Sequence, residues 1–156
     1  MSTWWINEPF VRGSSNPTDE ELEALRKQGF SVLVSLLDEK EQHPNYSRKR
    51  AHELGYDRRS IPVRDFQAPT IEQLIKFKEL IDSAPDSKVL IHCQGGTGRT
   101  GTFAAAYWIA RGIKPVDAIA KVREARPKAV ETPAQEAVLS QFADQLRSAS
   151  QGAGST

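Results

Sequence analysis

The amino-acid sequence predicts a single α/β domain with a central, mostly parallel sheet flanked by helices. Short apolar segments of strand length alternate with longer segments of helical periodicity, which is the pattern of such a fold. The chain has 156 residues and a hydrophobic fraction of 38%, enough for the core of one ordinary domain. No repeat or linker divides it, so we expect a catalytic domain over residues 1–147 and a disordered tail over residues 148–156.

Strands and helices alternate in the first half of the chain. Thr18 and Glu21 form a capping-box pattern, which predicts a helix start, and Gly29 is typical of a helix end. Ser31–Leu37 is an apolar run of the kind found in buried parallel strands. The pattern predicts strands over residues 4–6, 10–12, 31–37 and 56–62, a loop over residues 13–17, and helices over residues 18–28 and 47–54.

The second half contains four predicted helices and one predicted strand. Thr70 and Gln73 form another capping-box pattern, ahead of apolar residues at helical spacing. Pro115 suits the first turn of a helix, and Thr132 with Gln135 gives a third cap signal. The pattern predicts a strand over residues 88–92 and helices that begin near residues 70, 98, 115 and 132, the last ending near residue 147.

Charge and composition argue against several classes of partner. Lys and Arg total 21 and Asp and Glu total 20, so a net charge of +1 gives no global attraction to nucleic acid or to an acidic membrane. No apolar stretch is long enough to span a bilayer, and no secretory signal pattern begins the chain. The single cysteine, Cys93, rules out an internal disulfide. We therefore expect a cytoplasmic monomer.

The segment VLIHCQGGTGRTG, residues 89–101, carries the strongest chemical signal. It places Cys93 at the carboxyl end of a predicted strand, where ligands bind in open α/β sheets. Glycines follow and a helix then begins, so backbone N–H groups can turn inward around an anion. The planar guanidinium of Arg99 suits two phosphate oxygens. The sequence predicts a phosphate site built from Gln94, Gly95, Gly96, Thr97, Gly98 and Arg99.

The same surroundings would activate the thiol of Cys93, because positive charge favours the thiolate, which is the nucleophile. Expulsion of an alkoxide or phenolate also needs a general acid. Asp65, in a loop flanked by Pro62 and Pro69, is the best candidate, and its carboxylate could then activate water. The hydroxyl of Thr100 could hydrogen-bond the departing thiolate. No His or Cys cluster suggests zinc, so the predicted mechanism needs neither a metal nor a cofactor.

The pattern His92-Cys93-x-x-Gly96-x-x-Arg99-Thr100-Gly101 resembles the signature of the protein tyrosine phosphatase superfamily. Residues 61–69 resemble its general-acid loop. In its length and its segment 131–135, the chain looks most similar to small archaeal tyrosine phosphatases and small atypical dual-specificity phosphatases. The resemblance covers residues 12–147. It implies hydrolysis of phosphate monoesters on a phosphorylated protein or peptide, phosphotyrosine above all, through a phosphocysteine intermediate.

The resemblance also implies a role for individual residues. Cys93 would be the nucleophile, Arg99 the phosphate clamp, and Asp65 the general acid and then the base. His92 and Thr100 would tune the thiolate. Gln135 would match a glutamine that orients water in related tyrosine phosphatases.

Three departures from the family pattern leave alternatives open. Glu131 stands where related enzymes carry another glutamine, Arg64 directly precedes Asp65, and no counterpart of the phosphotyrosine-recognition loop is evident. Glu131 therefore enters the site as a second candidate for positioning water. Dual specificity stays open, as do activity on phosphoinositides or RNA 5′ ends and a non-enzymatic role as a phosphate-binding pseudophosphatase. Residues 94–98 contain none of the lysines that lipid-directed relatives tend to carry, which disfavours the phosphoinositide alternative.

Overall fold

A five-stranded sheet with the strand order β1-β2-β5-β3-β4 forms the centre of the protein. The structure is a computed structural model that describes the backbone of residues 1–154 and the side chains of residues 1–150. The strands are β1 (Thr3–Asn7), β2 (Val11–Ser14), β3 (Phe30–Leu37), β4 (Asp57–Val63) and β5 (Lys88–His92). β1 pairs with β2 antiparallel, whereas the other three pairings are parallel. The predicted α/β class with a mostly parallel sheet is confirmed.

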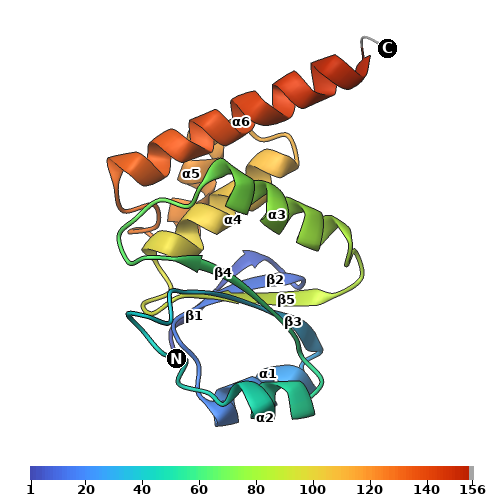
Figure 1. Cartoon of the computed structure of the whole chain (residues 1–156), viewed down its shortest axis with the longest axis vertical. Coiled ribbons are helices and arrows are strands. Elements are labelled where there is room, and N and C mark those ends of the chain that lie inside the picture. Colours follow the sequence, from blue (N-terminus) through green and yellow to red (C-terminus); the bar gives the residue numbers. More distant parts are fainter. Residues whose placement is uncertain (155–156) are drawn as a thin grey trace.

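Helices cover both faces of this sheet (Figure 1). The smaller layer contains α1 (Asp19–Lys27) and α2 (Arg48–Glu53), and the larger layer contains α3 (Ile71–Asp82), α4 (Gly98–Ala110), α5 (Pro115–Ala125) and α6 (Pro133–Gly154). Both predicted capping boxes are present. The side chains of Thr18 and Thr70 accept hydrogen bonds from the backbone N–H groups of Glu21 and Gln73. The side chains of Glu21 and Gln73 in turn accept hydrogen bonds from the backbone N–H groups of Thr18 and Thr70. These local signals therefore place the starts of α1 and α3.

The alternating side chains of β3 divide the apolar interior into two clusters. Val32, Val34 and Leu36 belong to the cluster beneath the larger helical layer, whereas Leu33 belongs to the cluster beneath α1 and α2. α4 is buried along nearly its whole length, between the sheet and the neighbouring helices. The core therefore holds the N-terminus of α4, which lies at the end of the glycine-rich loop that begins after Cys93.

Two predicted boundaries are wrong, and the first concerns Gly13 and Ser14. The sequence suggested a loop there, but both residues belong to β2, where Gly13 pairs with Trp4 on one side and with Ile91 on the other. The absence of a side chain at Gly13 gives room to its neighbours, since a Cβ there would lie 2.9 Å from both the Trp4 ring and Thr100 Cγ2. Pairing with two strands overrides the turn propensity of the local sequence.

The second correction concerns the end of the last helix. The sequence predicted an end near residue 147, but α6 continues past Arg147 to Gly154, because Ser148, Ala149 and Ser150 do not break a helix. Residues 155 and 156 lie outside the described part of the chain. Within residues 1–154, no helix combines the length and the apolar character needed to cross a membrane.

A buried polar chain ends at His92, the last residue of β5. Arg58 Nε donates to the Tyr46 hydroxyl at 2.9 Å, and the same hydroxyl is hydrogen-bonded to His92 Nε2 at 2.8 Å. His92 Nδ1 then faces the carbonyl oxygen of Cys93 at 3.4 Å. Burial lowers the pKa of His92 to about 3; the hydrogen bond to the Cys93 carbonyl opposes this, and the charges of Arg58 and Arg99 add to it. His92 is therefore a neutral link between β4 and the backbone of Cys93.

This neutral histidine makes the stability of the fold depend on pH. The unfolded chain binds a proton at His92 below its ordinary pKa of about 6.5, whereas the native chain does so only near pH 3. The free energy of unfolding should therefore fall as pH decreases from about 6.5 towards 3, by up to about 1.4 kcal/mol per pH unit from this residue. Urea unfolding of the wild type and of His92→Gln at several pH values in this range measures the difference in slope.

The exposed residue His52 provides the control. His52→Gln should keep the wild-type pH slope, while His92→Gln should flatten it, whatever the absolute stability of either variant. Equal slopes for the wild type and His92→Gln would contradict the assignment of a neutral His92.

Candidate active site

The predicted phosphate loop connects the carboxyl end of β5 to the N-terminus of α4. Cys93, the first residue after β5, is almost completely buried, with 2% of its surface exposed. Its sulfur accepts hydrogen bonds from Gly96 N at 3.2 Å and from Thr100 Oγ1 at 3.1 Å. These two donors, together with the positive end of α4, surround the sulfur with partial positive charge. The structure thus brings Thr100 into contact with Cys93, as the sequence suggested.

Backbone geometry holds the loop in its turned conformation. Gly96 has a φ of 74°, which favours glycine over residues with a side chain. A Cβ at this position would also clash with the backbone, because it would lie 2.5 Å from Ser15 N. The Gly96 carbonyl accepts a hydrogen bond from Trp4 Nε1 at 2.8 Å. At Gly98, a Cβ would lie 2.4 Å from Glu131 Oε1, so Glu131 packs directly against the start of α4. The loop therefore fits between β1–β2 and the residues before α6.

Arg126, which the sequence analysis did not identify, supports the outer side of the same loop. Its guanidinium donates to the Gly95 carbonyl at 3.2 Å, to Thr97 Oγ1 at 3.1 Å and to Ser2 Oγ at 2.8 Å. The position of Arg126 just after α5 and before a proline gives no signal of these contacts in the sequence, because they join segments far apart in the chain. Arg126 helps hold two of the predicted phosphate-binding residues.

Arg99 is a buried charge, with 2% of its side chain exposed. Nη1 donates to the Val63 carbonyl at 2.8 Å, and Nη2 donates to Gln42 Oε1 at 2.8 Å. Nη2 also lies 3.4 Å from Asp65 Oδ1. These two hydrogen bonds go to neutral acceptors and fix the guanidinium plane while leaving other N–H groups for a phosphate.

Asp65 lies in the connection between β4 and α3, and 40% of its side chain is exposed. Its Oδ2 accepts from Gln42 Nε2 at 3.0 Å, and its Oδ1 accepts from Phe66 N at 3.0 Å. Phe66 has a positive φ of 64° and is itself exposed. The Asp65 backbone and the Arg64 side chain are both hydrogen-bonded to Glu41. The segment before α2 thus holds the predicted acid loop.

One cavity of about 230 Å³ joins most of the predicted residues. It is lined by Asp65, Phe66, Cys93, Gln94, Gly95, Thr97, Gly98, Arg99 and Glu131. The nucleophile, clamp and acid that the sequence predicted therefore face one space, although Asp65 is distant from the other two in the chain. In the described part of the chain, no three His, Cys, Asp or Glu side chains gather in a way that could hold a metal ion.

Gln135 does not line this cavity. It is fully buried, accepts hydrogen bonds from the backbone N–H groups of Glu131 at 2.8 Å and Thr132 at 3.3 Å, and donates to the Gln67 carbonyl at 3.2 Å. These contacts tie the start of α6 to the acid loop. Glu131, by contrast, faces the cavity. Positioning of water by either residue stays a prediction.

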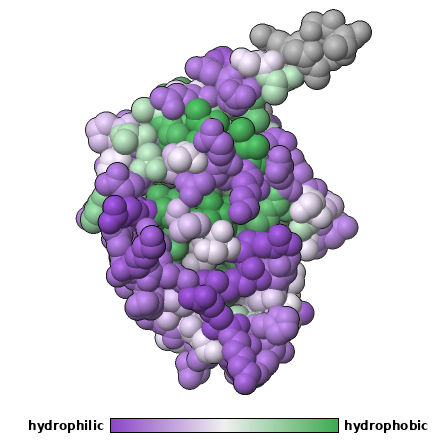
Figure 2. Space-filling model, viewed as in Figure 1, coloured by the Kyte–Doolittle hydropathy of each residue, from purple (hydrophilic) through white to green (hydrophobic). Residues whose placement is uncertain are grey.

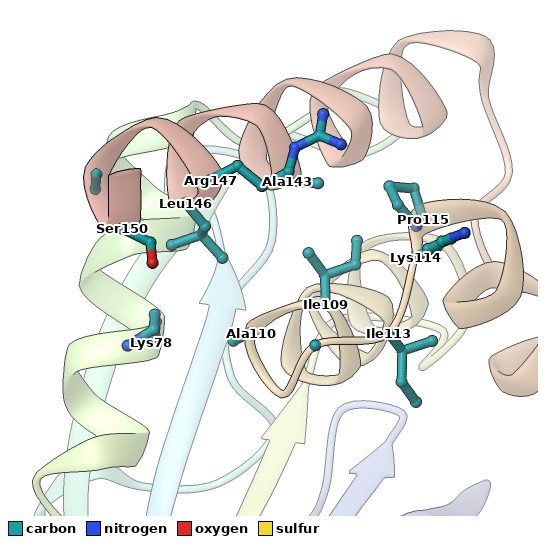
Figure 3. Close-up of a pocket in the computed structure, with 12 residues that line it drawn as sticks. Lys78, Ile109, Ala110, Ile113, Lys114, Pro115, Ala143, Leu146, Arg147 and Ser150 are labelled. Atoms are coloured by element: carbon teal, nitrogen blue, oxygen red, sulfur yellow. The ribbon is translucent and has the colours of Figure 1, made fainter. Parts of the chain in front are cut away.

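A larger cavity of about 640 Å³ lies elsewhere, between the end of α4 and the C-terminal part of α6 (Figure 3). Ile109 and Leu146 point into it from opposite sides, with Lys114 and Arg147 at its edge. Apolar residues gather on this helical half of the surface (Figure 2). None of the predicted catalytic residues lines this cavity.

Comparison with known proteins agrees with this geometry. Residues 10–113 match the family model described as "Polymorphic toxin system, DSP-PTPase phosphatase". Human dual specificity protein phosphatase CDC14C is 32% identical over 92 residues, which are 58% of this chain and 20% of that protein. The chain therefore spans about one fifth of the length of this relative.

Solved structures show the same fold over nearly the whole chain. Tk-PTP in its active form superimposes with a TM-score of 0.82 at 34% identity, covering 92% of this chain and 97% of that one. PTPMT1 in complex with PI(5)P gives a TM-score of 0.84 at 20% identity, covering 95% and 98%, and this likeness concerns the fold alone. Family model, sequence relatives and fold agree, and the chain belongs to the DSP-PTPase family of cysteine-based phosphatases.

Proposed function

We propose that the protein hydrolyses phosphate monoesters on proteins, with a preference for phosphotyrosine, through a phosphocysteine intermediate on Cys93. One observation supports this most directly: Cys93, Arg99 and Asp65 line a single cavity. These are a nucleophile, a phosphate clamp and a proton donor. A phosphate-binding pseudophosphatase would not need all three groups together.

In the first step, the backbone of residues 94–99 and the guanidinium of Arg99 hold the phosphate over Cys93. The thiolate attacks phosphorus, so an S–P bond forms as the P–O bond to the leaving group breaks. Asp65 gives its proton to the departing oxygen. The product alcohol or phenol leaves, and the phosphate stays on Cys93.

In the second step, water attacks the phosphocysteine. Asp65, now a carboxylate, takes a proton from this water as the new P–O bond forms and the S–P bond breaks. Thr100, whose hydroxyl donates to the sulfur at 3.1 Å, stabilises the departing thiolate. We expect Glu131, which lines the same cavity, to order the attacking water, with Gln135 acting indirectly by holding the backbone of Glu131. Release of inorganic phosphate completes the cycle without a metal or cofactor.

The proposed substrate is a phosphorylated protein or peptide. The relative CDC14C is named a dual specificity phosphatase, and PTPMT1 was crystallised with a phosphoinositide. Phosphothreonine and phosphoinositide substrates therefore both belong in the test. A protein substrate is favoured because residues 94–98 offer no lysine for additional phosphates. An exposed Phe66 beside the cavity offers an apolar ring to an aryl group.

Substrate preference is tested by comparing kcat/KM on peptides of one sequence that carry phosphotyrosine or phosphothreonine, and on a soluble phosphoinositide. We expect phosphotyrosine to exceed the others by about tenfold or more, equivalent to at least about 1.4 kcal/mol in transition-state binding. Equal rates on phosphotyrosine and phosphothreonine would replace the preference with dual specificity. A higher value for the phosphoinositide would contradict a protein substrate.

Replacement of the nucleophile tests the covalent mechanism. Cys93→Ser should abolish turnover, because an alcohol is a far weaker nucleophile than a thiolate, yet it should still bind phosphotyrosine peptide through the loop and Arg99. Phosphate release measures the first property and calorimetric titration the second. The surface variant Ser83→Ala keeps the nucleophile and should turn over at the wild-type rate. Turnover by Cys93→Ser above a mock purification would contradict attack by Cys93.

Replacement of the acid tests proton donation. Asp65→Asn cannot donate a proton, so kcat on phosphotyrosine should fall by roughly 10²–10⁴-fold, the usual effect of general acid catalysis. An activated aryl phosphate, whose leaving group needs less protonation, should lose much less. Stopped-flow or steady-state rates on both substrates give the comparison, with the surface variant Asp82→Asn as the control. Equal losses on both substrates would exclude Asp65 as the acid and redirect attention to Glu131.

A further inference from the structure

Gln42 lies between the two charged groups of the proposed active site. Its Oε1 accepts a hydrogen bond from Arg99 Nη2 at 2.8 Å, and its Nε2 donates to Asp65 Oδ2 at 3.0 Å. Gln42 belongs to the connection between β3 and α2, whereas Asp65 follows β4 and Arg99 lies in the first turn of α4. One partly buried side chain thus joins three separate segments of the protein at the catalytic cavity.

These two contacts require a neutral side chain that can both accept and donate a hydrogen bond. The guanidinium of Arg99 needs an acceptor, and the carboxylate of Asp65 needs a donor. A carboxylate at position 42 could not donate to Asp65, and an ammonium group could not accept from Arg99. An amide serves both and adds no charge beside a bound phosphate. Gln42 therefore suits the gap between Asp65 and Arg99 as neither Glu nor Lys would.

Gln42 also limits how closely the acid and the clamp approach each other. A bidentate Arg–carboxylate pair has N–O distances of about 2.7–2.9 Å, whereas Arg99 Nη2 and Asp65 Oδ1 are 3.4 Å apart. A full ion pair would draw the guanidinium away from the phosphate and the Asp65 carboxyl away from the leaving group. By occupying one N–H of Arg99 and one oxygen of Asp65, Gln42 opposes that pairing.

The remaining contacts of this region support such a role. Arg99 Nη1 is fixed by the Val63 carbonyl, and Glu41 contacts the Arg64 side chain and the Asp65 backbone. These bonds place the two segments, but they do not orient the Asp65 carboxyl. Apart from Gln42, that carboxyl contacts the adjacent Phe66 N and the guanidinium of Arg99.

We infer that Gln42 is a positioning residue for catalysis, one that keeps Asp65 and Arg99 apart and aims both at the same phosphate ester. The inference rests on the proposed function, because it assigns Gln42 an effect through the acid and the clamp rather than on substrate directly. Its signature is a dependence on the leaving group, which a merely structural residue would not show.

The experiment replaces Gln42 with Met, which has similar length and neither hydrogen bond. In the wild-type background, Gln42→Met should lower kcat on phosphotyrosine peptide about 10- to 100-fold, the effect of losing hydrogen bonds to charged groups. The loss should be much smaller on an activated aryl phosphate. The inhibition constant of inorganic phosphate should rise, because Arg99 then pairs with Asp65. Lys40→Met, on the same connection, should leave all three values unchanged.

A double-mutant cycle with Asp65→Asn distinguishes a failure of the role inferred for Gln42 from a failure of the acid role proposed for Asp65. If Gln42 acts through Asp65, adding Gln42→Met to Asp65→Asn should change kcat on phosphotyrosine by only about twofold. Full additivity, or equal losses on both leaving groups, would overturn the inference about Gln42 while leaving the acid role of Asp65 intact. If Asp65→Asn itself shows no leaving-group dependence, the assignment of the acid fails, and the role of Gln42 fails with it.

Discussion

The buried guanidinium of Arg99 imposes the main constraint on this structure. A charge that is 98% removed from solvent is costly unless its N–H groups find acceptors, and the Arg99 acceptors come from outside its own loop. The Val63 carbonyl and the Gln42 amide meet this need, and the Asp65 carboxyl supplies compensating charge nearby. The contacts that compensate the buried Arg99 guanidinium therefore bring together the end of β4, the connection before α2 and the acid loop.

The phosphate loop itself is held by a different set of contacts. Trp4 and Arg126 bind the carbonyl groups of Gly96 and Gly95, so the loop carbonyls face away from the cavity towards these donors. This leaves N–H groups for the inner side, as the bond from Gly96 N to the Cys93 sulfur illustrates. An anion site made of backbone groups requires such an arrangement, because each peptide unit points its carbonyl and its N–H in opposite directions.

The two sides of the site differ in how firmly they are held. Cys93, Arg99 and Thr100 are buried and rest on α4, which lies in the core. Asp65 and Phe66 are considerably exposed and depend on side-chain contacts from the connection before α2. The groups proposed for phosphate binding and nucleophilic attack therefore lie on a well-packed part of the fold, whereas the proposed proton donor lies on a surface loop. This contrast makes Gln42 important, since it links the exposed half to the buried half.

Local patterns in the sequence determined the secondary structure, the fold class and the position of the phosphate loop. Capping boxes at Thr18 and Thr70, and the strand–glycine–helix pattern around Cys93, act between residues that are close in the chain, so the sequence alone shows them. Asp65 could be selected because it lies in a proline-flanked loop, and because that loop resembles a known general-acid loop. Its distance from Arg99 could not be deduced, because separate strands set it.

Only the tertiary structure decided the residues that support the site. Gln42 and Arg126 carry no motif, and their roles arise from contacts with partners that are distant in sequence. The structure likewise places Gly13 within the sheet, through pairing with two strands. Gln135 has its side chain on backbone groups rather than in the cavity. The physical reason is the same in each case: a hydrogen bond across the fold depends on the relative placement of whole elements, which local sequence preference does not encode.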